Sequence, residues 1–221
     1  MKRAIQISES IELGIILALS GGFMDAYSYM ERGEVFANAQ TGNMLLMGVY
    51  FSEGNYHNAI NYLCPVLAFA VGIALADMVH MLEFNRLHWR QISVIVEAII
   101  LAGVSFIPGT LDLLANSLTS LACGIQVESF RKIHGNGIAT TMCIGNLRSA
   151  TQNLCDYIKY KDKNSREKSL LYYGIILCFI LGAVIGNIFV RNFHEKAIMA
   201  CSVMLFISFI LMFIDREHKR I

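Results

Sequence analysis

The chain has 221 residues, of which 55% are hydrophobic and only 16% are charged. A soluble domain needs a polar shell and is nearer a quarter charged, so this composition excludes an ordinary soluble fold. The formal net charge is +1, and no basic stripe lies away from the apolar blocks, which excludes nucleic acid as a partner.

Six apolar blocks follow one another along the chain. They cover residues 11–30, 59–82, 91–107, 112–130, 169–190 and 197–214. At about 1.5 Å per residue, each is about long enough for a hydrocarbon layer of roughly 30 Å, and 91–107 is the shortest. We therefore predict an all-α membrane protein with six transmembrane helices and almost no domain outside the lipid bilayer.

Basic residues distinguish the two sides of these spans. They gather at the N-terminus, in the connections 83–90 and 131–168, and in the C-terminal tail, whereas the connection 31–58 is acidic. Cytoplasmic loops carry the excess of Lys and Arg in membrane proteins. Six spans with both termini in the cytoplasm satisfy that rule. Eight spans, with 38–52 and 138–156 crossing fully, would scatter the basic loops onto both sides.

Two segments are neither plain spans nor plain loops. Residues 35–51 and 138–156 each open with small and polar residues and close with a run too short to span. Irregular backbone at membrane depth is tolerated only where protein buries it or where it lines a wet cavity. We expect both to be re-entrant or broken half-helices, with the polar residues at the tip or the break.

The chain also resembles itself. Asp25–Tyr29 matches Gln126–Phe130, Gly42-Asn43 matches Gly145-Asn146, and 68–77 aligns with 178–187. Each copy holds three spans and one polar segment. Because three is odd, the second copy must enter the membrane from the opposite face. We predict a 3+3 inverted repeat with copies at 1–110 and 111–221.

Several motifs match a known pattern. They are Gly22-Phe23-Met24-Asp25-Ala26, Phe36-x-Asn38-x-Gln40-Thr41-Gly42-Asn43, and the later Gly124-x-Gln126 with Thr140-Thr141 and Gly145-Asn146. With these motifs the whole chain resembles the YoaK family of small bacterial integral membrane proteins, a domain family of unknown function. The resemblance implies a multi-pass protein of the bacterial plasma (inner) membrane and supplies no activity.

Two acids stand inside predicted spans. Asp25 lies in the first predicted span. Glu97 lies in the middle of the block 91–107, which is the fourth helix when the polar segment 35–51 is counted as the second. An isolated carboxylate there is costly unless it is neutral, paired or wet, so each is a candidate binding residue. Asp25 has the alternative role of capping a broken helix. Arg148 or a proton could neutralise Glu97, whose alternative role is a structural interhelical hydrogen bond.

The polar segments supply the other candidate binding residues. These are Asn38, Gln40, Thr41, Asn43, Gln126, Glu128, Thr140, Thr141 and Asn146. Free N–H groups at a half-helix N-terminus favour anions or polar oxygens, although the same side chains also suit capping of the broken helices. Glu128 has a simpler alternative, an ion pair with Arg131 or Lys132 one turn later.

Glycines and cysteines indicate packing. We expect Gly14, Gly72, Gly103, Gly182 and Gly186 to mark close helix approaches, within the chain or in a homo-oligomer. The six cysteines form no CxxC pair and no histidines pair at metal spacing, so neither a disulfide framework, a metal nor a cofactor is expected.

These features favour a transporter or channel for a small polar solute or ion, with a midplane site where the two copies meet. Asp25 and Glu97 would couple or select cations or protons. One alternative is a non-transporting scaffold or sensor subunit, which would tolerate Asp25→Asn. A membrane-embedded enzyme with these two acids is the weaker alternative, because no hydrolase or metalloprotease motif occurs and we expect no enzyme.

Overall fold

The computed structural model describes residues 9–81 and 88–213. Its helices are α1 (Ile11–Glu31), α2 (Gln40–Ser52), α3 (Tyr56–Met81), α4 (Trp89–Val104), η2 (Gly109–Leu111), α5 (Asp112–Ser129), α6 (Cys143–Tyr160), α7 (Lys163–Phe193), η3 (His194–Ile198) and α8 (Met199–Leu211). Strands β1 (Lys132–Ile133) and β2 (Asn136–Gly137) form a small antiparallel pair between α5 and α6. The predicted all-α class is confirmed for the described residues.

The six apolar blocks correspond to α1, α3, α4, α5, α7 and α8. By length and composition, three stretches of the described chain could cross a membrane: Ile11–Glu31, Tyr56–Met81 and Lys163–Leu211, the last of which comprises α7, η3 and α8. Helix α4 has only 16 residues, and α5 buries polar side chains such as Asn116 and Thr119. The count of six spans therefore stays a prediction.

The outer surface of the bundle is apolar. Along α3 the exposed side chains include Leu67, Val71, Leu75 and Met78, and α7 and α8 expose similar rows. Soluble monomers rarely expose contiguous apolar surface on this scale, whereas lipid tails solvate it without cost. Together with the apolar helices, this surface supports a membrane protein.

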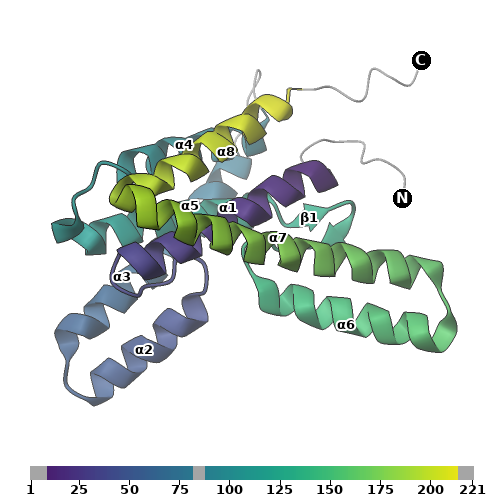
Figure 1. The fold of residues 1–221 in the computed structure, drawn as a ribbon, viewed down its shortest axis with the longest axis horizontal. Helices are drawn as coiled ribbons and strands as arrows, with labels where there is room; N and C mark the ends of the chain where they lie inside the picture. Colours follow the sequence, from purple (N-terminus) through teal and green to yellow (C-terminus); the bar gives the residue numbers. More distant parts are fainter. Residues whose placement is uncertain (1–8, 82–87, 214–221) are drawn as a thin grey trace.

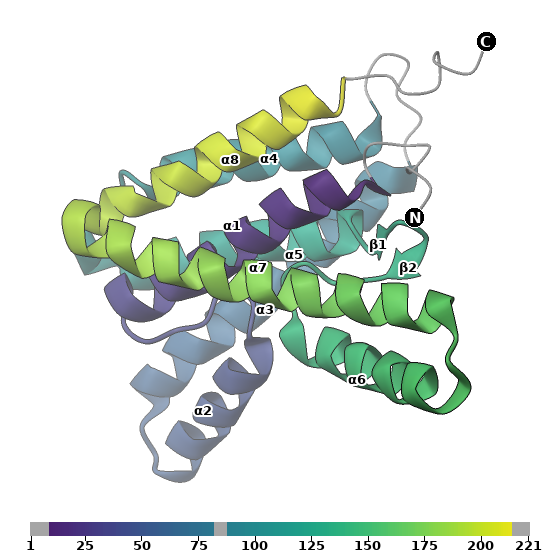
Figure 2. The same ribbon diagram turned by 45° about the vertical axis from the view of Figure 1, so that its right-hand side comes forward.

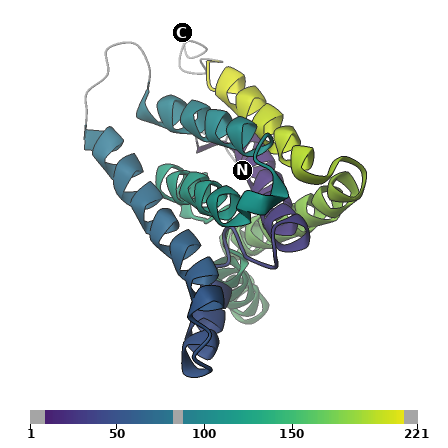
Figure 3. The same cartoon turned by 90° about the vertical axis from the view of Figure 1, so that its left-hand side faces the viewer.

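Two close helix crossings organise the bundle. Gly22 of α1 and Gly182 of α7 each leave no room for a Cβ, because the backbone of the other helix lies against them, at Phe179 and Leu19 respectively. Gly72 of α3 and Gly124 of α5 do the same against Leu121 and Phe69. Figure 3 shows α3 crossing α5 in a view turned by 90°. Backbones at this distance require glycine at the crossing point.

The predicted glycine approaches have mixed outcomes. The predictions for Gly72, Gly182 and Gly186 are confirmed, and Gly182 and Gly186 pack against α1 of the same chain. Gly14 meets only the side chain of Ile133. Gly103 makes no close approach to another helix of the described chain, since a Cβ at this position would meet nothing within 4 Å, so a contact between subunits stays a prediction there.

Contacts between helices fix their directions. Rising positions along α1 meet falling positions along α5, from Leu17–Gln126 to Arg32–Asn116, so α1 and α5 are antiparallel. Rising positions along α1 meet rising positions along α7, from Leu19–Gly182 to Phe23–Gly186, so these two are parallel. Helices α4 and α8 are antiparallel, since Gln91 contacts Met212 and Ala98 contacts Ser202.

Two helical hairpins extend away from the bundle. Figures 1 and 2 show α2 with the start of α3, and α6 with the start of α7, projecting to different sides of the bundle that the other helices form with the rest of α3 and α7. Asp162 begins α7 as its N-cap, accepting hydrogen bonds from the backbone N–H groups of Asn164 and Ser165. The Ser165 hydroxyl also donates to Asp162, and this bond together with the two backbone bonds holds the pKa of the exposed Asp162 carboxyl below its usual range. The polar segments 35–51 and 138–156 thus each lead into the first helix of a hairpin.

A buried arginine fastens the end of α1. Arg32 is 1% exposed, and its guanidinium donates to Asp112 at 2.9 Å, to the carbonyl of Ile107 at 2.8 Å and to the hydroxyl of Tyr27 at 2.7 Å. Its own carbonyl accepts from Asn116 at 2.6 Å. The start of α5 is thereby tied to the point where the chain leaves α1.

Candidate functional site

The first polar segment folds back along α1. Asn38 donates its side-chain amide to the carbonyl of Gly21 at 3.0 Å, and its backbone N–H donates to Asp25 Oδ1 at 2.7 Å. Helix α2 then starts at Gln40, and its N-cap residue Ala39 offers no side-chain acceptor. The backbone N–H groups of Ala37 and Ala39 also interact with the Asp25 carboxylate. Asp25 therefore caps α2 from the neighbouring helix.

The second polar segment reaches the same point of α1. A Cβ on Gly21 would lie 3.2 Å from the carbonyl oxygen of Thr140 and 3.3 Å from the Cα of Thr141. Gln126 of α5 holds this segment, because its Nε2 donates to Thr140 Oγ1 and to the carbonyl of Leu17, each at 3.1 Å. The two polar segments consequently meet at Gly21. The first contacts its carbonyl through Asn38, and the second packs against its Cα through Thr140 and Thr141.

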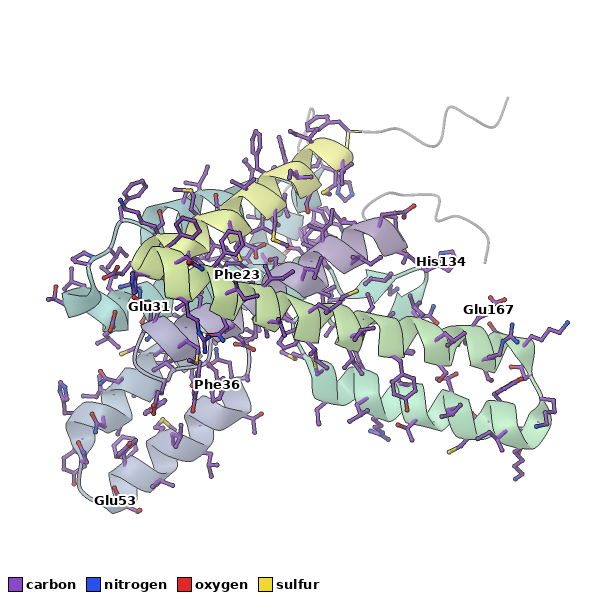
Figure 4. The ribbon with its side chains drawn as sticks, in the orientation of Figure 1. Phe23, Glu31, Phe36, Glu53, His134 and Glu167 are labelled. Atoms are coloured by element: carbon purple, nitrogen blue, oxygen red, sulfur yellow. The ribbon has the colours of Figure 1, made fainter. Side chains whose placement is uncertain are left out.

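Matching asparagines shape the two segments. Asn43 accepts from the backbone N–H of Phe36 at 3.0 Å and donates to the carbonyl of the same residue at 2.7 Å. Asn146 bridges the N–H and carbonyl of Ala139 in the same way, at 3.4 Å and 2.6 Å. Figure 4 labels Phe36 at the base of the α2–α3 hairpin, beside α1. Each asparagine replaces the backbone partners that an irregular segment lacks.

The remaining residues of the first segment divide between the interior and the surface. Gln40 is buried and donates to the carbonyl of Ala37 at 2.7 Å and to Ser120 at 3.3 Å. Thr41 is exposed on α2. The structure thus gathers Asp25, Asn38, Gln40 and Asn43 near Gly21 and leaves Thr41 outside this group.

Several buried oxygen atoms around this meeting point have no hydrogen-bond partner among the described residues. They are Ser20 Oγ, Gln126 Oε1 and Thr141 Oγ1, together with Asn38 Oδ1, which faces the thiol of Cys123. Buried polar atoms in folded proteins almost always have partners, and exceptions indicate a ligand, a water or strain. Ser20 was missed from the sequence, because a single serine beside two glycines predicts only helix packing.

Glu97 lies in the same interior, on α4. Its side chain is 0% exposed, and neither carboxyl oxygen has a hydrogen-bond partner among the described residues. Cys123 of α5 and Cys201 of α8 lie within electrostatic range of it. The alternative that Arg148 neutralises Glu97 is wrong, because Arg148 is exposed on α6 and makes no ion pair with it in the described chain.

Glu128 and Arg148 belong to a separate surface. They line an open groove of about 570 Å³ beside the start of α6, together with Arg131 and Asn146. Arg131 pairs with Glu128 at 3.2 Å, one helical turn away. The simpler reading of Glu128 as an ion-pair partner is therefore confirmed. Among the described residues no group of three or more His, Cys, Asp or Glu side chains is placed to hold a metal ion.

Comparison with known proteins gives a family and no activity. A family model described as "Protein of unknown function (DUF1275)" matches residues 13–211. The UPF0700 transmembrane protein YoaK of Bacillus subtilis (strain 168) is 25% identical over 199 residues, which cover 86% of this chain and 88% of that protein. No solved structure matches.

Proposed function

We propose that this chain is a transporter or channel for a small polar solute or ion. It belongs to the DUF1275 family of proteins of unknown function, as its motifs predicted. The bilayer is its environment, and its relative is named a transmembrane protein. The observation that carries the proposal is the meeting of the two polar segments at Gly21, among buried oxygen atoms that have no described partner.

The directions of the helices support an inverted repeat. With α1–α4 as one copy and α5–α8 as the other, the first helices α1 and α5 are antiparallel, and so are the fourth helices α4 and α8. The first helix of each copy crosses the third helix of the other at matching glycines. Inverted copies that place broken segments at their interface are the architecture of many transporters.

In this architecture α2 and α6 are half-helices that start near the midplane. Helix α2 leads toward the outer face and α6 toward the cytoplasm, with both termini cytoplasmic. The α2–α3 hairpin ends near the acidic Glu53, which Figure 4 labels, and the α6–α7 hairpin ends near Lys159, Lys161 and Lys163. This charge difference agrees with the positive-inside rule.

The atoms at the meeting point indicate the kind of solute. Ser20, Gln126 and Thr141 offer oxygen acceptors without partners, and Asp25 adds a carboxylate. Acceptors of this kind suit a solute that donates hydrogen bonds, such as an amine or amide, or a partly dehydrated monovalent cation. Substrate binding at such a site would satisfy the buried oxygens that the fold leaves open.

Uptake into proteoliposomes tests the proposal. The probes are isotope-labelled amino acids, simple amines, and radioactive sodium and rubidium ions, each compared with empty liposomes. Thr141→Val and Ser20→Ala remove hydroxyls whose oxygens accept no described hydrogen bond, so both variants should fold normally. We expect each to reduce the uptake of the active probe about tenfold, as expected for one lost hydrogen bond of roughly 1.4 kcal/mol.

Ser117→Ala is the matched control, since the Ser117 hydroxyl is exposed and bonds its own helix at Leu113. It should leave uptake unchanged. Uptake that no probe raises above empty liposomes contradicts transport and favours the scaffold or sensor alternative. Uptake that survives both Thr141→Val and Ser20→Ala moves the site away from Gly21.

A further inference from the structure

The two acids inside the bundle are held in opposite ways. Asp25 accepts a hydrogen bond from the backbone N–H of Asn38 and interacts with two more N–H groups at the start of α2. Glu97 is fully buried in α4, and neither of its oxygens accepts or donates a hydrogen bond in the described chain. Only the first acid is surrounded by groups that stabilise a negative charge.

No cation faces Glu97 among the described residues. Helix α5 presents the thiol of Cys123 and α8 that of Cys201, and Asp25 of α1 lies within electrostatic range of Cys123. His80 of α3 contacts Trp89 at the start of α4, away from the midpoint where Glu97 lies. The charged residues of η3, at the other end of α4, are His194, Glu195 and Lys196.

A charge in this position is expensive. An ionised carboxylate without a partner in apolar protein costs several kcal/mol. An apolar residue of the same size would make a more stable core, because the neighbours of Glu97 include Val94, Ala98 and Leu101. Packing therefore does not explain why an acid occupies this position. The cation that such a closed site accommodates is a proton.

We propose that Glu97 binds and releases a proton in the folded protein and thereby couples transport to the proton gradient. The coupling role rests on the proposed function. Cys123 lies within electrostatic range of both Glu97 and Asp25, so a charge on Glu97 would be felt near the place where the two polar segments meet. Release of the proton places a negative charge behind the candidate site and changes its preference for a cationic solute.

Infrared spectroscopy of the full chain in lipid tests the proton site without a substrate. At neutral pH we expect the carbonyl stretch of a protonated carboxylic acid, which shifts in heavy water and disappears reversibly as the pH rises. Glu97→Gln, which keeps the shape of the side chain, should abolish this band. Glu97→Met should do the same if the amide perturbs folding. Asp25→Asn and the exposed Glu53→Gln should retain it.

Three results would overturn the proton site: no such band at neutral pH, a band that survives Glu97→Gln, or a band that ignores pH while the protein stays folded.

Coupling is measured separately, as uptake of the active probe with and without an imposed pH gradient. We expect the gradient to raise uptake by the wild type and not by Glu97→Gln. An equal response of the two proteins to the gradient contradicts coupling. If no probe is taken up, the proposed function fails, and the infrared result still decides the proton site.

Discussion

Gly22 of α1 and Gly124 of α5 occupy the same position in two different crossings. Each lies against the backbone of the third helix of the other half, at Phe179 and at Phe69. A methyl group on either glycine has no space unless a whole helix moves. The closeness of these crossings brings both polar segments within reach of α1.

Gly124→Ala should lower the melting temperature markedly. The added Cβ overlaps the backbone of α3, and overpacking of this kind costs about 1–3 kcal/mol or more. Gly103→Ala is the matched control, because its Cβ meets no described atom within 4 Å and alanine favours a helix by roughly 1 kcal/mol. Thermal unfolding in detergent measures both. Equal melting temperatures would contradict the crossing.

The asparagine bridges should matter equally in both halves. Asn43→Ala and Asn146→Ala each remove two hydrogen bonds to the backbone of one residue, at a cost of about 2 kcal/mol, and Asn43→Ala also removes the bond to Gln40 Oε1. Asn153→Ala is the control, since Asn153 bonds only its own helix at Ser149. We expect lower melting temperatures for the first two variants and little change for the third. A selective effect in one half would show that the bridges differ in role.

Arg32→Met should be strongly destabilising. It breaks the ion pair with Asp112 and the bonds to Tyr27 and Ile107, and removal of one partner from a buried pair costs about 3 kcal/mol. Arg131→Met removes an ion pair whose arginine side chain is 60% exposed, so it should cost less than about 1 kcal/mol. Similar melting temperatures for the two variants would mean that Arg32 is not a structural anchor.

Single cysteines test the orientation of the hairpins. In a cysteine-free background, Glu53→Cys at the end of α2–α3 should react with a membrane-impermeant maleimide added outside intact cells. Asn164→Cys at the start of α7 should react only after the membrane is opened, because the proposed inverted repeat would point these hairpins to opposite faces. Labelling of both positions from the same side would exclude the inverted repeat.

The sequence predicted the helices well because hydrophobic blocks are a local signal. The block 59–82 became α3 at Tyr56–Met81, and 112–130 became α5 at Asp112–Ser129. The sequence could not predict the burial of Arg32, because its partners Ile107, Asp112 and Asn116 lie 75, 80 and 84 positions away along the chain. As a lone basic residue in an acidic connection, Arg32 gave no sign of burial.

The candidate site was predicted in kind and only partly in detail. Asn38, Gln126 and Thr141 were identified because amides and hydroxyls in an apolar chain need partners. The sequence comparison aligned Asp25 with Gln126. The crossing glycines instead make Gly22 equivalent to Gly124, so the residue equivalent to Asp25 in the second half is Val127. For aligning the two halves, similarity between polar residues is a weaker guide than a close contact between two helix backbones. No single residue type in the sequence reveals such a contact.

The crossings also set the order in which the protein can be assembled during synthesis. Helix α1 leaves the ribosome before α7 and α8, yet the Tyr27 hydroxyl donates to a backbone carbonyl 168 positions later and the backbone carbonyl of Ser20 accepts from a thiol 181 positions later. The first half therefore waits in the membrane with its glycine face open until α7 and α8 emerge. Premature release of the nascent chain would leave that face exposed to other proteins of the bilayer and to quality-control proteases.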